Sequence, residues 1–237
     1  MLEMMQKHQS HLDTIIVRIF DIGFASIALI ALLPLLSVVA ALLSITGERE
    51  VFYMQPRVGK NGVAFNILKF ATMLKNSPNL AGGSVTVAGD PRILPMGTIL
   101  RKTKINELPQ LWNIIVGDMS IVGPRPQTPS CFKEFSEAGR QKIASVTPGL
   151  TGIGSLLFSD EEGILANCGQ NTADFYTNYI VPYKEDLEIW YIENASLSLY
   201  FKVIILTATK VLLRSKRQVI HSFPTIPDTP EPLRSFI

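Results

Sequence analysis

Residues 101–126 read RKTKINELPQLWNIIVGDMSIVGPRP and combine cations, a carboxylate, a short apolar segment and a glycine-proline turn. Asn106 is the predicted N-cap of a helix with Glu107 in its first turn, where Pro109 is tolerated because first-turn amides have no partner within the helix. Free amides and the positive end of the helix dipole attract anions, so this helix start predicts a phosphate site. Apolar residues at helical spacing predict a face packed into the core or against a membrane: Leu108, Leu111, Trp112 and Ile115.

Residues 22–45 form an uncharged apolar run that is long enough to cross a hydrocarbon layer of about 30 Å as a straight helix. Pro34 lies in the middle of this run and predicts a break, because it removes a backbone donor and clashes with the preceding turn. We therefore expect a re-entrant membrane helix over residues 18–46, with an ordinary spanning helix as the alternative. Arg18 is expected either to reach lipid phosphates or to pair locally with Asp21.

Several motifs recur in order along the chain and together resemble one family. They are QPRVG at 55–59, KFATM at 69–73, GDPR at 89–92, NELPQ at 106–110, GDMS at 117–120, GPRP at 123–126 and TPGLTG at 147–152. This pattern resembles the bacterial sugar transferases, the monotopic polyprenol-phosphate phosphoglycosyl transferases, over roughly residues 18–213. The chain departs from the family pattern at Asn106, which replaces a nucleophilic Asp, at Ala71, which replaces a basic residue, and at Tyr200, where Asp is frequent.

The expected architecture is an α+β fold with four parts. Residues 1–17 are a polar leader, 18–46 the re-entrant helix, 47–213 a cytosolic catalytic domain and 214–237 a flexible proline-rich tail. Short strands at 51–53 and 65–68, joined by turn residues, predict a β-hairpin within a small domain of helices. Residues 174–213 predict helices with breaks at Pro182 and at 194–196, and their aromatic and basic residues are typical of amphipathic helices at a membrane interface.

The resemblance implies transfer of a phospho-sugar from a UDP-sugar to polyprenol (undecaprenyl) phosphate with release of UMP, as the initiating step of bacterial surface glycan synthesis. It also implies Mg²⁺ as cofactor, since a divalent cation neutralises the diphosphate. The expected location is the bacterial inner membrane, with the globular domain on the cytoplasmic face. Membrane lipid, a homodimer or downstream glycosyltransferases are candidate partners, whereas the net charge of +2 gives no support for nucleic acid binding.

The candidate site residues fall into groups by expected role. Catalytic roles are expected for Lys69, Asn106 and Glu107. Phosphate binding is expected for Arg57, Arg101, Lys102 and Arg125. Supporting roles are expected for Gln110, Asp118, Gly123 and Pro124, metal binding for Glu107 and Asp118, and the membrane break for Pro34. Prolines on both sides of Arg125 fix its backbone, as a preorganised phosphate clamp requires.

Asn106 prevents a direct transfer of the family mechanism, because a neutral amide is a poor nucleophile toward a phosphoanhydride. Three hypotheses remain from the sequence. Glu107 takes the role of nucleophile, or the acceptor phosphate attacks directly while Glu107 and Mg²⁺ organise the site. In the third, the protein is a catalytically impaired homologue that serves as a nucleotide-sugar-binding or scaffold subunit.

Overall fold

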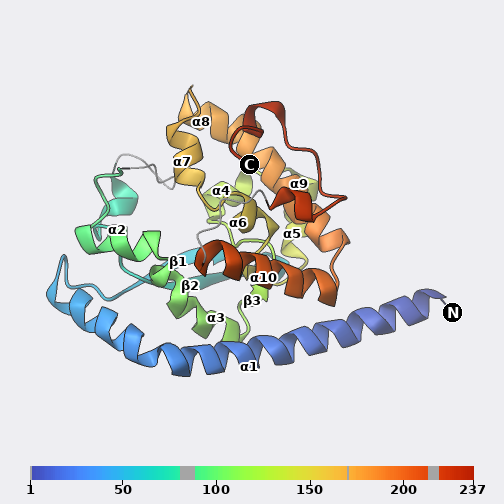
Figure 1. Ribbon diagram of the computed structural model, residues 1–237, viewed down its shortest axis with the longest axis horizontal. Helices are drawn as coiled ribbons and strands as arrows, with labels where there is room; N and C mark the ends of the chain where they lie inside the picture. Colours follow the sequence, from blue (N-terminus) through green and yellow to red (C-terminus); the bar gives the residue numbers. More distant parts are fainter. Residues whose placement is uncertain (1, 81–88, 170, 213–218) are drawn as a thin grey trace.

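The computed structural model describes residues 2–80, 89–169, 171–212 and 219–237 and has a mixed fold of helices with two small sheets (Figure 1). The α-helices are α1 (Leu2–Ile45), α2 (Pro95–Lys102), α3 (Leu111–Val116), α4 (Pro129–Lys133), α5 (Glu137–Ala144), α6 (Ile153–Leu157), α7 (Glu161–Ala166), α8 (Thr172–Phe175), α9 (Val181–Glu193) and α10 (Leu197–Leu212). The strands are β1 (Phe52–Val58), β2 (Ala64–Phe70), β3 (Ser120–Val122) and β4 (Gly149–Thr151). Short 3₁₀ segments are Lys60–Gly62, Ser77–Asn79, Ile105–Gln110, Ile220–Ser222 and Glu231–Leu233, and a π segment is Tyr176–Ile180.

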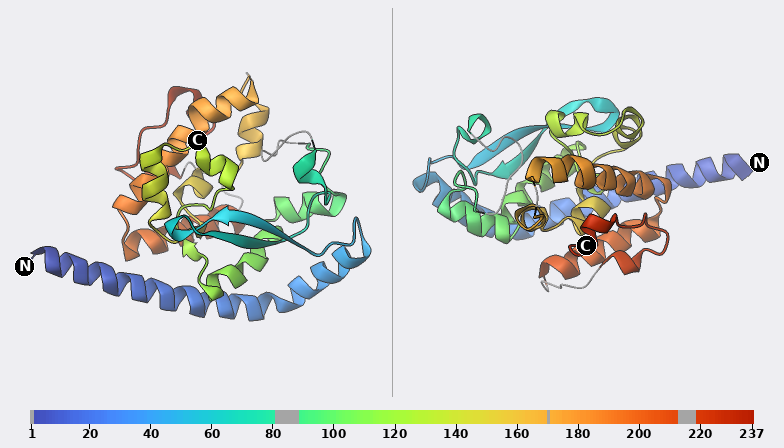
Figure 2. Two further views of the ribbon diagram at one scale, coloured as in Figure 1. Left: turned by 180° about the vertical axis from the view of Figure 1, so that it is seen from behind. Right: turned by 90° about the horizontal axis from the view of Figure 1, so that it is seen from above.

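Helix α1 runs along one side of the molecule, and its N-terminal end projects beyond the rest of the protein (Figures 1 and 2). It is a single curved helix that includes both the predicted leader and Pro34. Residues 13–45 are long and apolar enough to cross a membrane, and only 17% of the most apolar window is buried. The helix therefore exposes most of its apolar surface, and the re-entrant conformation stays a prediction.

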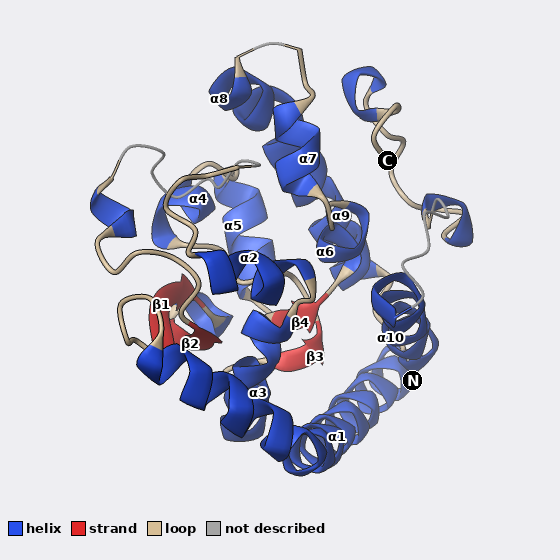
Figure 3. Cartoon of the chain, turned by 60° about the vertical axis from the view of Figure 1, so that its left-hand side comes forward, coloured by secondary structure: helices blue, strands red, loops and turns tan. Residues whose placement is uncertain are grey.

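Two polar residues attach α1 to the rest of the protein. The Arg18 guanidinium donates to the carbonyl oxygens of Ile114 (2.6 Å) and Ile115 (3.0 Å) at the end of α3. The buried Asp21 carboxylate accepts hydrogen bonds from the amide of Ile121 (2.9 Å) and the hydroxyl of Tyr200 (2.5 Å). The two residues form no ion pair with each other in the described part of the chain, so that predicted alternative is wrong. Their bonds place α3, β3 and α10 along α1 (Figure 3).

The predicted hairpin is confirmed, although its strands are longer than the sequence indicated. β1 pairs with β2 in antiparallel register from Phe52 opposite Phe70 to Val58 opposite Ala64. Pro56 lies inside β1, where it is tolerated because a two-stranded sheet consists of edge strands that need only half of their backbone donors. Lys69 lies near the end of β2, and the segment Ile105–Gln110 packs against this strand.

A second sheet joins the segment that contains Gly123 to the segment that contains Gly149 and Gly152. β3 pairs with β4 in parallel, with Ser120 opposite Gly149 and Val122 opposite Thr151. A Cβ atom on Gly149 would lie 2.1 Å from the Gly123 nitrogen, and one on Gly152 would lie 2.2 Å from the Gly123 oxygen. Only glycine permits this close approach, which fixes the turn that carries Arg125.

The C-terminal residues 219–237 are part of the fold, so the predicted flexible tail is wrong for them. Leu233 is 0% exposed and Phe223 is buried in the main hydrophobic core. The Tyr183 hydroxyl on α9 donates to the Pro227 carbonyl at 3.1 Å, and the ring of Phe236 contacts that of Phe175. The prolines of this segment exclude regular helix and strand, but they do not prevent packing.

The C-terminal helices largely follow the prediction. A break separates α9 from α10 at residues 194–196, as expected, whereas Pro182 begins α9 instead of interrupting a helix. Large apolar side chains remain exposed on the helices beside α1: Trp112 and Val116 on α3, and Phe201 and Ile205 on α10. Because α1 is itself exposed along most of its length, these helices and α1 together present an extensive apolar surface.

Candidate active site

Glu107 and Arg125 form the centre of the site. An Arg125 nitrogen donates to Glu107 Oε1 at 2.9 Å, and the two side chains are 34% and 17% exposed respectively. Burial alone would raise the pKa of Glu107, but the charges of Arg125, Lys69 and Lys104 outweigh it and lower this pKa to about 2. The nearby carboxylate raises the pKa of Arg125. Glu107 is therefore ionised at neutral pH.

Lys69 lies within the same electrostatic environment. Burial and the charges of Arg57, Arg125 and Arg101 together lower the pKa of its ammonium group to about 7, while the charge of Glu107 opposes the fall. Cations from β1, α2 and the turn after β3 thus act on Lys69, and Lys69 and Arg125 act on a single carboxylate. Like charges held this close favour the binding of an anion, because a bound phosphate relieves their mutual repulsion.

Arg57 supports the turn that carries Arg125. Its guanidinium donates to the Pro126 carbonyl at 2.8 Å and to Gln55 Oε1 at 2.6 Å. Burial and the charge of Arg125 lower the pKa of Arg57 to about 10. The sequence predicted a phosphate contact for Arg57, whereas the structure shows these two donors bound to the protein itself, with the Pro126 bond bracing the Gly-Pro-Arg-Pro turn.

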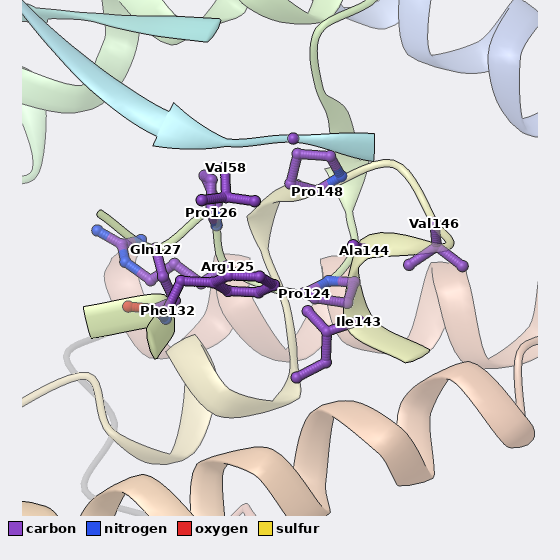
Figure 4. A pocket seen from close by; sticks show the side chains of 11 residues that line it. Val58, Pro124, Arg125, Pro126, Gln127, Phe132, Ile143, Ala144, Val146 and Pro148 are labelled. Atoms are coloured by element: carbon purple, nitrogen blue, oxygen red, sulfur yellow. The ribbon is translucent and has the colours of Figure 1, made fainter. Parts of the chain in front are cut away.

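A small hollow lies beside the turn. Its volume is about 10 Å³, and Pro124 and Arg125 line it together with Phe132 of α4 and Ile143 of α5 (Figure 4). This volume is about the minimum for one water molecule, so no substrate fits in this hollow.

The two predicted cations of α2 differ in their surroundings. Arg101 pairs with Glu162 at the start of α7, and one of its nitrogens lies 3.9 Å from Met73 Sδ. Lys102 is exposed, and Lys104 is the cation of this segment whose charge acts on Glu107. The sequence motifs did not single out Lys104, because Arg101 and Lys102 precede it and account for the expected phosphate contacts. It has a left-handed backbone (φ 60°) directly before the turn that holds Glu107.

Asn106 is not the N-cap of a helix, which corrects the sequence prediction. It lies inside the 3₁₀ segment Ile105–Gln110, and α3 begins only at Leu111. Asn106 is 6% exposed, and its Oδ1 has no hydrogen-bond partner within the described ranges. Gln110 is likewise buried, and its Nε2 lacks a partner there. The positive charge near Glu107 therefore comes from side-chain cations and not from the start of a long helix.

The sequence predicted both Glu107 and Asp118 as metal ligands, and in the structure Asp118 has a hydrogen-bond partner of its own. Asp118 follows α3 and accepts a hydrogen bond from Asn113 at 3.2 Å, whereas Glu107 precedes α3. Asn113 also binds the hairpin through the backbone of Asn66 and Leu68, so Asp118 belongs to a structural contact. No group of three His, Cys, Asp or Glu side chains suited to a metal occurs among the residues that the structure describes.

Glu188 is a charged residue of this region that the sequence did not single out. It is buried on α9, and its Oε1 accepts a hydrogen bond from the backbone amide of Arg125 at 3.4 Å. Burial raises the pKa of Glu188 to about 7, although the Arg125 amide and the charges of Lys184 and Arg125 oppose the rise. A single acid within a helical pattern carries no recognisable signature, so only the fold reveals this contact.

The proteins that share sequence with this chain include the following three. The undecaprenyl-phosphate glucose phosphotransferase of Komagataeibacter xylinus is 34% identical over 203 residues, which cover 84% of this chain and 36% of that protein. The exopolysaccharide production protein PSS of Rhizobium leguminosarum bv. phaseoli is 36% identical over 151 residues, covering 61% and 75%. The UDP-N-acetylgalactosamine-undecaprenyl-phosphate N-acetylgalactosaminephosphotransferase of Aeromonas hydrophila is 38% identical over 115 residues, covering 48% and 27%. The chain thus spans well under half the length of the first and third relatives.

A family model provides broader coverage than two of these relatives. The model described as "Bacterial sugar transferase" matches residues 12–214, a range that contains all the candidate site residues named above. This match confirms the resemblance drawn from the motifs. The chain belongs to the bacterial sugar transferase family.

Proposed function

We propose that this protein transfers a sugar phosphate from a UDP-sugar to undecaprenyl phosphate and releases UMP, as the initiating step of bacterial surface glycan synthesis. The names of relatives support the acceptor, a UDP-linked donor and a role in exopolysaccharide production. The observation that carries the proposal is the ionised Glu107 carboxylate, paired with Arg125 and surrounded by the charges of Lys69 and Lys104. A diphosphate fits these cations, and a carboxylate beside it is placed to react.

Glu107 is the proposed nucleophile. An oxygen of its carboxylate forms a bond to the phosphorus that carries the sugar, the bond from this phosphorus to the bridging oxygen breaks, and UMP leaves with that oxygen and its electron pair. A phosphate oxygen of undecaprenyl phosphate then attacks the same phosphorus, and Glu107 leaves as a carboxylate. Neither step requires a proton transfer, because nucleophiles and leaving groups are all anions.

The choice of Glu107 over Asn106 follows from chemistry and accessibility. The amide of Asn106 is neutral and only 6% of this residue is exposed, whereas the Glu107 side chain is 17% exposed. Arg125 has guanidinium donors beyond the one bound to Glu107, and these can bind the transferring phosphoryl group. Fixed cations at this point stabilise charge that develops on phosphate oxygens in the transition state.

The residues of this site fit Mg²⁺ through a single carboxylate, that of Glu107. Magnesium in phosphate-transferring sites is bound through one or two carboxylates and the substrate phosphates, and Glu107 supplies one carboxylate here. Asp118 already accepts a hydrogen bond from Asn113, so the ion would be bound mainly through the diphosphate. When bound, it would neutralise part of the diphosphate charge alongside Arg125 and Lys69.

Membrane association is part of the proposal. Helix α1 exposes an apolar surface of sufficient length, and the neighbouring helices α3 and α10 add exposed aromatic and aliphatic side chains. An acceptor with a long isoprenoid chain requires such a location. Because nucleotide sugars are cytosolic, we place the domain on the cytoplasmic face of the inner membrane, with α1 in a re-entrant conformation.

The experiment is a comparison of UMP release with and without acceptor. Purified protein in detergent micelles is mixed with Mg²⁺ and either UDP-glucose or UDP-N-acetylgalactosamine. We expect up to one equivalent of UMP without acceptor and continuous release once undecaprenyl phosphate is added. Mass spectrometry should find the phospho-sugar on the peptide that contains Glu107. The variant Glu107→Gln should lose both signals, whereas the same change at the exposed Glu137 should lose neither.

The two alternatives predict different outcomes. Release of UMP only in the presence of acceptor, with no labelled peptide, would contradict the covalent step and favour direct attack by the acceptor phosphate. Tight binding of UDP-sugars without any UMP from a panel of donors would contradict the transferase proposal and favour a nucleotide-sugar-binding or scaffold subunit.

A further inference from the structure

An apolar cavity of about 330 Å³ lies between the C-terminal end of α1 and helix α2. Its walls are mostly aliphatic or thioether side chains: Leu43, Ala71, Met73, Leu94, Met96 and Ile99. The volume is at the lower end of the range for ligand sites, about 300 to 1,000 Å³. A cavity of this size and lining is suited to a hydrocarbon chain of a few isoprene units.

The cavity adjoins the cations of the proposed active site. Residues 69–73 are extended, because β2 ends at Phe70 and Met73 still forms a bridge with Ile93. Alternate side chains of an extended segment point to the same side, so Lys69, Ala71 and Met73 share one face. Ala71 and Met73 line the cavity, and Met73 Sδ also lies 3.9 Å from Arg101.

We propose that this cavity binds the first isoprene units of the polyprenyl phosphate acceptor, with its phosphate directed to Lys69 and Arg101. The inference rests on the proposed function and names the place of its second substrate. The chain of the acceptor reaches the cavity from the lipid, since Ile99 at its rim is 61% exposed and Ile45 near the end of α1 is 74% exposed. Phosphate and hydrocarbon are thereby bound by adjacent parts of one extended segment.

A sugar is a poorer occupant of this cavity than a hydrocarbon chain. A hydroxyl group buried without a hydrogen-bond partner is unfavourable, and the walls offer few polar side chains. Two of these, Glu48 and Glu50, already bind Lys75 through its backbone amide and its ammonium group respectively. The donor sugar therefore belongs on the other side of the cations, near Arg125.

Photo-crosslinking tests the location without depending on turnover. The protein in detergent micelles is irradiated with a polyprenyl phosphate that carries a diazirine on its first isoprene unit, and labelled peptides are identified by mass spectrometry. We expect labels within residues 43–50 and 93–99, and we expect unlabelled undecaprenyl phosphate to compete. Labels confined to the outer surface of α1 or to α10 would overturn the inference, even if UMP release proceeds normally.

Two variants and a matched control test the contact. Ala71→Phe fills the cavity and Ile99→Asn makes its rim polar, and each should weaken binding of the polyprenyl phosphate at least about tenfold, the effect of losing burial of about two methylene groups. Ile205→Asn on α10 makes the same change at a similarly exposed position, 62%, and should leave binding unchanged. Equal losses at Ile99 and Ile205, or unchanged binding by a folded Ala71→Phe protein, would overturn the inference.

The outcome is separable from that of the proposed function. Labels in the cavity without any UMP release would support the acceptor site and contradict the transferase reaction. UMP release with labels elsewhere would support the reaction and contradict the site. A melting temperature for each variant shows whether a loss of binding comes from unfolding.

Discussion

Replacing Lys69 by Met should stabilise the protein while weakening its binding of the donor. Burial and neighbouring cations lower the pKa of this ammonium group from 10.5 to about 7, so the fold disfavours its charged form. Met has a similar length and no charge. The variant therefore removes an unfavourable interaction from the folded state, at the expense of a cation that the diphosphate needs.

The magnitude follows from the difference in pKa between the unfolded and folded states. At about 1.4 kcal/mol for each factor of ten in proton affinity, the fall to about 7 corresponds to roughly 4 to 5 kcal/mol. Lys69 keeps part of its surface in water, and its removal leaves Glu107 with one cation fewer, so we expect about half of this, roughly 2 kcal/mol. For a chain of this size that is an increase of about 4 to 8 °C in melting temperature.

The direction of the change in the pKa of Lys69 also determines how stability depends on pH. Below about pH 7, Lys69 is protonated in both states, and the whole cost is present. Between about pH 7 and 10.5 the unfolded state binds more protons, so the wild-type protein gains stability as the pH rises. The advantage of Lys69→Met should therefore be larger at about pH 6 than at about pH 9.

Differential scanning fluorimetry in detergent micelles at both pH values measures this effect. The exposed Lys60 provides the control, because Lys60→Met should change the melting temperature little at either pH. Binding of UDP-sugar should weaken at least about tenfold in Lys69→Met. A lower melting temperature for this variant, or a gain that is the same at both pH values, would refute the reasoning.

The remaining predictions concern stability and the role of Glu107. Glu188→Gln should raise stability by about 2 to 3 kcal/mol at about pH 8, where Glu188 is a buried, charged carboxylate in the folded wild-type protein. Below about pH 4.5 Glu188 is protonated in both the folded and the unfolded state, so the gain should be small there; melting curves at both pH values check this. Asn106→Asp should lower UMP release at least about threefold, because a second carboxylate competes with Glu107 for Arg125; a large increase would contradict this. Gly152→Ala should cost about 1 to 3 kcal/mol, because its Cβ would lie 2.2 Å from a backbone oxygen, as chemical denaturation can show. Leu233→Ala should cost about 2 to 5 kcal/mol in the same assay, because this side chain is completely buried; an unchanged stability would mean that residues 219–237 do not pack as described.

Local sequence patterns predicted the elements that depend on local chemistry. The hairpin follows from apolar strands separated by turn residues, and the break between α9 and α10 follows from polar residues at 194–196. Local patterns predicted the wrong structure where contacts with distant residues determine the conformation. Residues 219–237 look unstructured by composition, yet Leu233 and Phe223 complete a core formed by other parts of the chain.

The candidate site also contains residues that the sequence predicted and residues that it did not. The order of motifs indicated that Lys69, Glu107 and Arg125 act together, and the structure brings these three charges together from separate segments. Spacing could not show that Asp118 accepts a hydrogen bond from Asn113, which also binds the hairpin. Nor could it reveal Glu188, whose contact with the Arg125 amide joins residues that are 63 positions apart.

The bonds of Asp21 make helix α1 inseparable from the rest of the protein. A terminal apolar helix usually serves as a replaceable tether, but the carboxylate of this one accepts two hydrogen bonds from the interior of the domain that follows. Deleting it to obtain a water-soluble fragment would strand the Ile121 amide and the Tyr200 hydroxyl without their acceptor. If α1 is embedded in lipid as we propose, its insertion is coupled to folding of the domain, and the register of this one helix sets the height of the proposed active site above the bilayer.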